Sequence, residues 1–283
     1  MTHDPLSAVV RAHSAGWLPD DQVAVGFSGG PDSCALLHAM VAAGVGGLLG
    51  VHVDHGMRPE SAGDAAAAAA LAAAWGVPCQ VVRLATAPRN ETEAREGRHA
   101  ALAAAGRRIV ALGHTADDQV ETLLLRIARG TGIAGLRGMS AFEPGPAGAA
   151  IVRPLLELPR DAIMAYLDRH GIVPLEDPTN ADPTFADRNL VRHGAVPALR
   201  QVNPRLAEAV GRLAELARED DDALGAWAAR ELAGLLGAGA GTAEAGTEAG
   251  PTRGGGGAGE PGSEAGPARG SGGAGEPGSE AGP

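Results

Sequence analysis

The sequence predicts a Rossmann-like α/β fold with a doubly wound, mostly parallel sheet, followed by a C-terminal helical region and a disordered tail. Between about residues 23 and 156, short apolar runs alternate with segments of helical periodicity. The first apolar run leads through a glycine turn directly into a helix, and residues after 236 are dominated by glycine, proline, alanine, serine and glutamate. Alternating strands and helices with short connections form parallel sheets that are covered on both faces.

Short apolar runs mark the expected strands, at 22–27, 48–53, 79–84 and 108–112, with a further candidate at 149–154. Between and after them, helical periodicity predicts helices over 32–43, 61–75, 90–105, 116–129 and 159–170, and then a loop rich in Pro, Asp and Asn over 174–183. Ligands of such sheets bind at the carboxyl ends of the strands. The motifs that follow the strands are therefore the candidates for function.

The chain is expected to divide into an α/β domain over 1–200, a helical region over 201–236 and a low-complexity tail over 237–283. The helical region is either one long amphipathic helix or a pair of helices divided at the acidic cluster Glu219–Asp222. In the tail the string GAGEPGSEAGP occurs at 257–267 and again at 273–283. This composition buries too little apolar surface to offset the entropy of ordering, which predicts disorder.

Composition excludes several classes of function. The chain of 283 residues has a net charge of −11, no apolar run of transmembrane length and a polar start, so we expect a cytoplasmic protein without a membrane partner. Cys34 and Cys79 lie in apolar surroundings without C-x-x-C spacing, which favours buried thiols over a disulfide, metal pair or redox centre. All 23 basic residues are arginine, so an enzyme-borne lysine Schiff base or adenylate is excluded, whereas bidentate phosphate contacts are favoured.

The glycine turn, Ser28–Ser33, has the sequence SGGPDS and lies between the apolar run 23–25 and a helix. A turn that opens a helix presents backbone N–H groups and the positive end of the helix dipole to an anion. It lacks the spacing and the lysine of a Walker loop. A carboxylate at Asp32 beside bound phosphates requires a cation such as Mg²⁺ between them. The alternative is an ordinary strand-to-helix turn.

The second expected strand ends in a polar segment that contains His52, Asp54 and His55. In a strand, residues three apart point to opposite faces, so the two histidines are poorly placed to share a metal ion. Asp54 and His55 lie at the carboxyl end of the strand, beside the glycine turn, where they can contact the sugar or base of a nucleotide. A polar strand exit that turns at Gly56 is an equally good interpretation.

The fourth expected strand is followed by acidic residues at a helix start. Asp117 and Asp118 lie in the first helical turn, where carboxylates favour the helix dipole, so capping alone explains them. Asp118 and Glu121, however, are spaced i, i+3 and share one helix face. Two carboxylates at this edge of the sheet can hold either a metal ion or the ammonium group of a substrate.

Arginines recur along the rest of the chain. Arg126, Arg129 and Arg137 flank a flexible Gly-Thr-Gly segment and form a basic stretch suited to a polyanion. Arg95 and Arg98 lie one helical turn apart, for which surface charge is the simplest explanation. Further arginines without aromatic partners suggest contacts to an RNA backbone rather than base stacking; they are Arg188, Arg192, Arg200 and Arg205.

Together these motifs resemble the tRNA(Ile)-lysidine synthetase family of N-type ATP pyrophosphatases, over about residues 20 to 205. The family's mark is an S-G-G-x-D-S loop after the first strand. The strings that carry the resemblance are SGGPDS at 28–33, HVDHGMRPES at 52–61, GHTADDQVETLLLRIARGTGIAGLRGM at 113–139, RPLL at 153–156 and EDPTNADPTFADRNLVRH at 176–193.

The resemblance implies that ATP and free L-lysine convert the wobble cytidine of a tRNA(Ile) with a CAU anticodon to lysidine. It implies a catalytic domain over 1–200 and a tRNA-binding element over 201–236. The implied ATP ligands are Ser28, Gly29, Gly30, Pro31, Asp32, Ser33, Asp54 and His55, with Asp32 assisting Mg²⁺. The implied catalytic residues are Asp32, Arg95 and Asp118; Asp118 and Glu121 would hold lysine, and Arg126, Arg129, Arg188 and Arg192 would bind tRNA.

Two other functions stay open on these motifs: ATP-dependent thiolation of a tRNA base by a related enzyme, and a nucleotide- and RNA-binding module without catalysis. The chain also departs from the family pattern, because Leu190 and Val191 stand where the family usually carries an arginine. Longer members of the family carry further C-terminal domains. A homodimer is compatible with the sequence.

Overall fold

The computed structural model describes residues 4–17, 21–56, 61–89, 91–145, 148–175 and 187–241. Contacts divide the chain into two units, Met1–Glu231 and Leu232–Pro283, which are treated separately. The fold and the site described below belong to the first unit. The tail was predicted over 237–283, but the last helix, Leu206–Gly241, extends into its first residues. The tail from 242 onward and the greater part of the predicted 174–183 loop lie outside the described residues.

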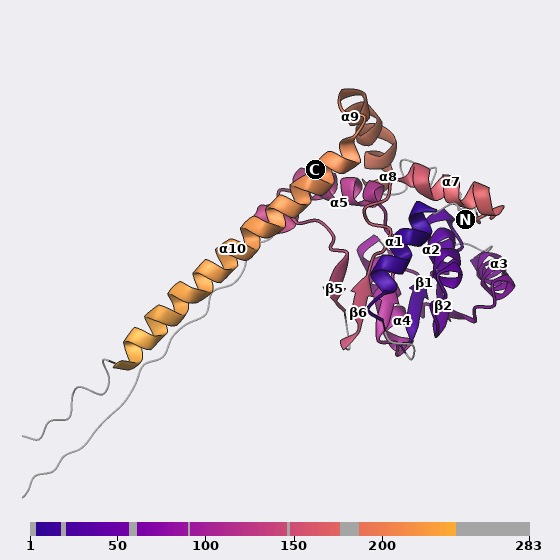
Figure 1. Ribbon diagram of the computed structural model, residues 1–283, viewed down its shortest axis with the longest axis horizontal. Helices are drawn as coiled ribbons and strands as arrows, with labels where there is room; N and C mark the ends of the chain where they lie inside the picture. The colour runs from indigo at the N-terminus through magenta and orange to yellow at the C-terminus, as the bar shows by residue number, and fades with distance from the viewer. Residues whose placement is uncertain are drawn as a thin grey trace, which may run out of the picture. The chain divides into compact units, whose positions relative to one another are not determined.

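The first unit contains a six-stranded sheet with the strand order β3-β2-β1-β4-β6-β5 (Figure 1). All neighbouring strands are parallel except β5, which pairs antiparallel to β6. The strands are β1 Val23–Gly26, β2 Leu48–Asp54, β3 Cys79–Arg83, β4 Ile109–Ala111, β5 Phe142–Pro144 and β6 Ala150–Val152. The predicted doubly wound, mostly parallel sheet is confirmed. Each expected strand is present; β2 is one residue longer than predicted and the others are slightly shorter.

Helices cover both faces of the sheet, because the central strands are apolar on both sides. On one face Val23 and Val25 of β1 pack with α1 (Pro5–Ser14), α2 (Pro31–Ala42), α3 (Ser61–Ala74) and α7 (Arg160–His170). On the other face Ala24 and Val110 pack against Leu102 of α4 (Glu91–Ala104). The alternation of buried side chains along β1 and β4 thus supplies two separate cores.

The remaining helices follow β4 and the last strand. They are α5 Ala116–Ala128, α6 Ile133–Leu136, α8 Asp187–Leu190, the π-helical segment η3 Val191–Ala195, α9 Val196–Val202 and α10 Leu206–Gly241. The acidic cluster Glu219–Asp222 does not interrupt α10, so the single long helix is the correct alternative. Among the described residues, no helix is both long and apolar enough to span a membrane.

Both cysteine thiols are free, as predicted. Cys34 is buried in α2, where its Sγ donates to the Gly29 carbonyl oxygen at 3.0 Å, whereas Cys79 at the start of β3 is half-buried. Burial raises the pKa of the Cys34 thiol to about 12, with a further contribution from the nearby Asp32 charge. Cys34 is therefore a core residue that stays protonated at neutral pH.

His38 of α2 joins two helices and makes the fold sensitive to acid. Its Nδ1 lies 2.8 Å from the Tyr166 hydroxyl, and its ring centroid lies 4.9 Å from that of His170, both on α7. Burial, and then the nearby His170, lower the pKa of His38 below its usual 6.5. A lowered pKa means that the folded state binds a proton less well than the unfolded state.

The stabilising contribution of neutral His38 is therefore complete above about pH 6.5 and is lost as the pH falls through its folded-state pKa. We expect the free energy of unfolding, measured by urea denaturation, to fall less steeply between pH 7 and 5 in His38→Gln than in the wild type. His13→Gln in α1 is the control. Identical pH profiles for wild type and His38→Gln would contradict the assignment.

Candidate functional site

The carboxyl ends of β1 and β4 meet, and the motifs that follow these strands are brought together there. Gly113, after β4, packs directly on the first turn of α2: a Cβ at this position would lie 2.9 Å from the Asp32 carbonyl oxygen. Only glycine permits this approach. The acidic start of α5 thus lies beside the glycine turn, as the order of the motifs predicts.

The glycine turn has the geometry of an anion site. Gly29 has a φ of +82°, and Gly30 is the N-cap of α2; the Gly30 backbone N–H donates to the Ser28 hydroxyl at 3.3 Å. The Ser33 hydroxyl donates to the Gly30 carbonyl oxygen at 3.0 Å and lies 3.2 Å from the Ser28 hydroxyl. The Ser28 hydroxyl proton and the N–H groups of the first helical turn can therefore be donated to an anion.

Asp32, in this first turn, carries a carboxylate suited to a cation. Its Oδ1 is buried and has no hydrogen-bond partner among the described residues, and its Oδ2 lies 3.3 Å from Nη1 of Arg160. Burial raises the pKa of Asp32 to about 6, although the Arg160 charge opposes the rise. A buried oxygen without a partner beside an anion site fits Mg²⁺, which prefers carboxylate and phosphate oxygens.

The predicted acid pair lies on one face of α5, and both members have protein partners. Asp118 accepts from the Thr115 backbone N–H at 2.8 Å and from its hydroxyl at 3.0 Å, which caps the helix. Glu121 is buried, with 3% of its side chain exposed. Asp118 therefore caps α5, as predicted, and it also lies beside the glycine turn.

Two arginines approach Glu121 from the segment 188–192. Nε and Nη2 of Arg192 donate to its two oxygens at 2.6 and 3.0 Å, and Nε of Arg188 donates at 2.9 Å. Nη2 of Arg192 also lies 3.7 Å from Asp118. Arg188 and Arg192, predicted as tRNA contacts, therefore lie at the acid pair, and Glu121 accepts three charge-assisted hydrogen bonds.

Asp117, whose role the sequence left open, links three helices. Its Oδ2 accepts from the backbone N–H of Arg160 at 2.7 Å, and its Oδ1 pairs with the Arg200 guanidinium. It therefore connects the first turn of α5 to the start of α7 and to α9. Because both oxygens have partners, Asp117 positions helices.

The other predicted basic residues have different environments. Arg126 donates to the carbonyl oxygens of Gly135 and Gly138 at 2.8 and 3.2 Å, and so fixes the segment around α6. Arg129 forms an exposed ion pair with Asp187 at 2.8 Å. Arg95 is exposed on α4. The pKa of His99 is lowered mainly by burial and secondly by the charge of Arg95.

Asp54 and His55 lie at the end of β2, as predicted. Asp54 is buried and accepts from the Gly56 backbone N–H at 2.8 Å. Burial alone would raise its pKa, but hydrogen bonds from Gly56 and the Ser61 hydroxyl, with the Arg83 charge, hold the pKa below its ordinary value. These contacts are those of a polar strand exit, and a role for Asp54 or His55 in nucleotide binding stays a prediction.

Sequence reasoning did not assign a chemical role to two arginines of the site, Arg153 and Arg160. Arg153, with 1% of its side chain exposed, donates to His114 Nδ1 at 3.1 Å, to the Ser140 carbonyl oxygen at 2.8 Å and to Glu143 at 2.5 Å. Burial, with the Arg153 charge, lowers the pKa of His114, which therefore stays neutral with Nδ1 as an acceptor. Arg160 is the other. An arginine inside the apolar run Ile151–Leu156 was the available signal, because a buried guanidinium needs several acceptors.

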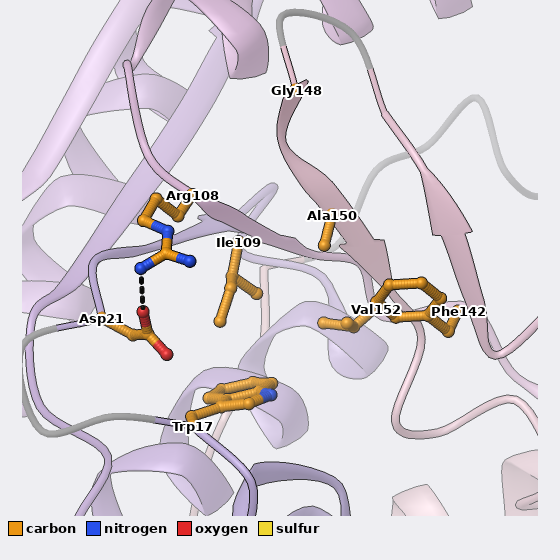
Figure 2. A pocket seen from close by; sticks show the side chains of 8 residues that line it. All are labelled: Trp17, Asp21, Arg108, Ile109, Phe142, Gly148, Ala150 and Val152. Atoms are coloured by element: carbon orange, nitrogen blue, oxygen red, sulfur yellow. Dashed lines mark ion pairs between the residues drawn. The ribbon is translucent and has the colours of Figure 1, made fainter.

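A separate pocket of about 240 Å³ lies on the sheet over β4 and β6 (Figure 2). It is lined by Trp17, Asp21, Arg108, Ile109, Phe142, Gly148, Ala150 and Val152. The Asp21–Arg108 ion pair, 3.3 Å long, closes one side of it. None of the predicted site residues lines this pocket.

Comparison with known proteins identifies the family of the chain. The PP-loop domain family matches residues 6–199. A tRNA(Ile)-lysidine synthase of Leifsonia xyli subsp. xyli is 41% identical over 248 residues, which cover 82% of this chain and 73% of the relative. The chain belongs to the tRNA(Ile)-lysidine synthase family. The resemblance drawn from the motifs is thereby confirmed.

Other tRNA(Ile)-lysidine synthases extend beyond this chain. A relative from Solibacter usitatus is 45% identical over 207 residues, or 71% of this chain, but the chain spans only about half of that protein, 46%. Among solved structures, a U34-tRNA thiolase from Methanococcus maripaludis has a TM-score of 0.61 at 16% identity, with 75% of this chain and 78% of that chain covered. This likeness shows a shared fold.

Two of the motifs typical of tRNA(Ile)-lysidine synthases are only partly described. Residues 57–60 of the second motif and 176–186 of the last lie outside the described residues. Leu190, one of the two residues that stand where the family usually has an arginine, is 63% exposed at the end of α8.

Proposed function

We propose that this chain ligates free L-lysine to C2 of the wobble cytidine of tRNA(Ile) with a CAU anticodon, in an ATP-dependent reaction that forms lysidine. The observation that carries the proposal is the juxtaposition of the glycine turn, with Asp32, and the acid pair Asp118 and Glu121. Membership of the tRNA(Ile)-lysidine synthase family supports the reaction class. An ATP site beside an ammonium site is what such a ligation requires.

The first step activates the base. The cytosine O2 attacks the α-phosphorus of ATP, a C–O–P linkage forms, and the bond to pyrophosphate breaks. The glycine turn and the N-terminus of α2 bind the phosphates, and Asp32 holds the cation. Mg²⁺ at Asp32 would neutralise charge on the departing pyrophosphate. Arg95 of α4 is assigned to the phosphates or to the activated base.

The second step transfers lysine. The ε-amine attacks C2, a C–N bond forms, and AMP departs with the oxygen that was O2 of the base, while the amine loses a proton. Asp118 and Glu121 are assigned to the ammonium group of lysine. Since Arg188 and Arg192 contact Glu121 at 2.6 to 3.0 Å, lysine at this carboxylate must replace at least one guanidinium. Arginines released in this way are available to the RNA backbone.

The proposal includes tRNA contacts by Arg129, Arg188 and Arg192, with Arg126 acting through the segment that it fixes around α6. The helical region 201–236 is proposed as a further tRNA-binding element. ATP with Mg²⁺, free lysine and tRNA as substrates agree with a cytoplasmic protein, and a homodimer is compatible with these assignments.

The direct test is transfer of labelled lysine into acid-precipitable RNA with ATP, Mg²⁺ and unmodified tRNA(Ile) carrying a CAU anticodon. We expect incorporation into this tRNA and none into methionine tRNA, the control with the same anticodon. Release of pyrophosphate that depends on tRNA, without lysine incorporation, would contradict the proposal and favour activation of the base for another nucleophile, as in thiolation. If neither lysine incorporation nor pyrophosphate release is observed, the result would indicate a binding module without catalysis.

A further inference from the structure

Arg160 lies at the meeting point of the glycine turn and the acidic start of α5. It is the first residue of α7, and its guanidinium Nη1 is 3.3 Å from Oδ2 of Asp32 in the first turn of α2. Its backbone N–H donates to Asp117 at 2.7 Å, which fixes the point from which the side chain extends. Because 45% of the side chain is exposed, the guanidinium can change its partner without leaving the site.

The charge balance of the site calls for such a cation. Bound ATP places several negative charges beside the buried Asp32 carboxylate, and phosphoryl chemistry depends on neutralising the leaving oxygens. The glycine turn contains no lysine, and neither does the rest of the chain. Arginine is therefore the only side chain of this protein that brings a permanent positive charge to the phosphates.

Among the described residues, Arg160 is the arginine that forms an ion pair with Asp32, at 3.3 Å. Arg192 binds both oxygens of Glu121, at 2.6 and 3.0 Å. Arg160 makes its side-chain ion pair with Asp32 alone among the described residues. A planar guanidinium offers five N–H donors in a fork that matches phosphate, so Arg160 is the arginine best placed to exchange a carboxylate for a phosphate.

We propose that Arg160 is a catalytic residue that binds the β- and γ-phosphates of ATP and stabilises the departing pyrophosphate, with Asp32 holding its guanidinium beside the glycine turn. When the bond between the α-phosphorus and the bridging oxygen breaks, the electron pair stays on pyrophosphate, where Arg160 lies as a fixed positive charge. Arg160 transfers no proton. This inference deepens the proposed function and rests on its first step, cleavage of ATP between the α- and β-phosphates.

The test compares Arg160→Gln with Arg169→Gln. Arg169 lies on the same helix, is 51% exposed and pairs with Asp4 at 3.0 Å, so it matches Arg160 in all but position. We expect Arg160→Gln to weaken ATP binding, measured by calorimetry with Mg²⁺, about tenfold or more, because the phosphates lose a charged partner. A tenfold change corresponds to about 1.4 kcal/mol. AMP lacks the β- and γ-phosphates and should bind within about twofold of the wild type.

Pyrophosphate release that depends on tRNA should fall about a hundredfold in Arg160→Gln, the usual effect of removing one electrostatic stabiliser. Arg169→Gln should leave both measurements unchanged. Arg160→Lys, which retains the charge without the fork, should recover part of the activity and serves if Arg160→Gln does not fold. Equal weakening of ATP and AMP, or unchanged pyrophosphate release, would overturn the proposal and leave Arg160 as a structural partner of Asp32. A wild type that releases pyrophosphate but incorporates no lysine would refute the proposed ligation and leave the role of Arg160 intact.

Discussion

Asparagine in place of Asp32 is expected to lower tRNA-dependent pyrophosphate release by about a hundredfold or more, because the proposed site loses the carboxylate assigned to its cation. The same change is not expected to lower stability. Asp32 Oδ1 is buried without a partner among the described residues, and burial raises the pKa of this carboxyl to about 6. The protein therefore holds an unfavourable charge at this position at neutral pH.

A raised pKa means that the stabilising contribution of protonated Asp32 is complete below its unfolded value of 3.8 and is lost as the pH rises through about 6. Asp32→Asn lacks this titration. Its free energy of unfolding, measured by urea denaturation, should therefore decline less between pH 5 and pH 7.5 than that of the wild type. Asp161→Asn, an exposed acid next to Arg160, is the control. Unchanged pyrophosphate release in Asp32→Asn would remove Asp32 from the mechanism.

Glutamine in place of Glu121 is expected to lower the free energy of unfolding by about 3 kcal/mol, since removing one partner of a buried ion pair leaves the other charges uncompensated. Glu121 is 3% exposed and binds Arg188 and Arg192, whose side chains are 28% and 31% exposed. The KM for lysine should rise more than the KM for ATP, because lysine and not ATP is assigned to this carboxylate.

Glu208→Gln is the matched control for stability. Glu208 lies on α10, is 60% exposed and is 4.0 Å from Arg212, so its loss should change the free energy of unfolding by less than about 0.5 kcal/mol. Equal increases of both KM values in Glu121→Gln would count against lysine binding by Glu121 and would restrict this residue to holding the two arginines. A stable variant with unchanged kinetics would contradict both roles.

The sheet was predictable because its strands are short apolar runs separated by helices, and local pattern decides such elements. The position of Asp32 beside an anion site followed from adjacent residues in one turn. Sequence reasoning did not anticipate the partners of Glu121, which are 67 and 71 residues away, or the contact between Asp32 and Arg160 across 128 residues. Ion pairs of this kind depend on how helices pack, and spacing along one helix cannot reveal them.

The short elements were missed for a related reason. The strand β5, Phe142–Pro144, exists because Phe142 pairs with Val152 of β6, a contact that its own three residues do not signal. The helix α1 was not predicted either, although its start is readable, because Asp4 caps the helix and Pro5 occupies its first position. The buried Arg153 is intelligible only with His114 and Glu143 in place around it.

Asp117 has a mechanical consequence for the whole site. One carboxylate joins the start of α7 to α9 while belonging itself to the first turn of α5. A shift of any one of the three helices therefore breaks the hydrogen bond from the Arg160 N–H or the ion pair with Arg200. Since α7 carries Arg160, which contacts Asp32, and α5 carries Asp118 and Glu121, Asp117 acts as a spacer between the two ends of the proposed site.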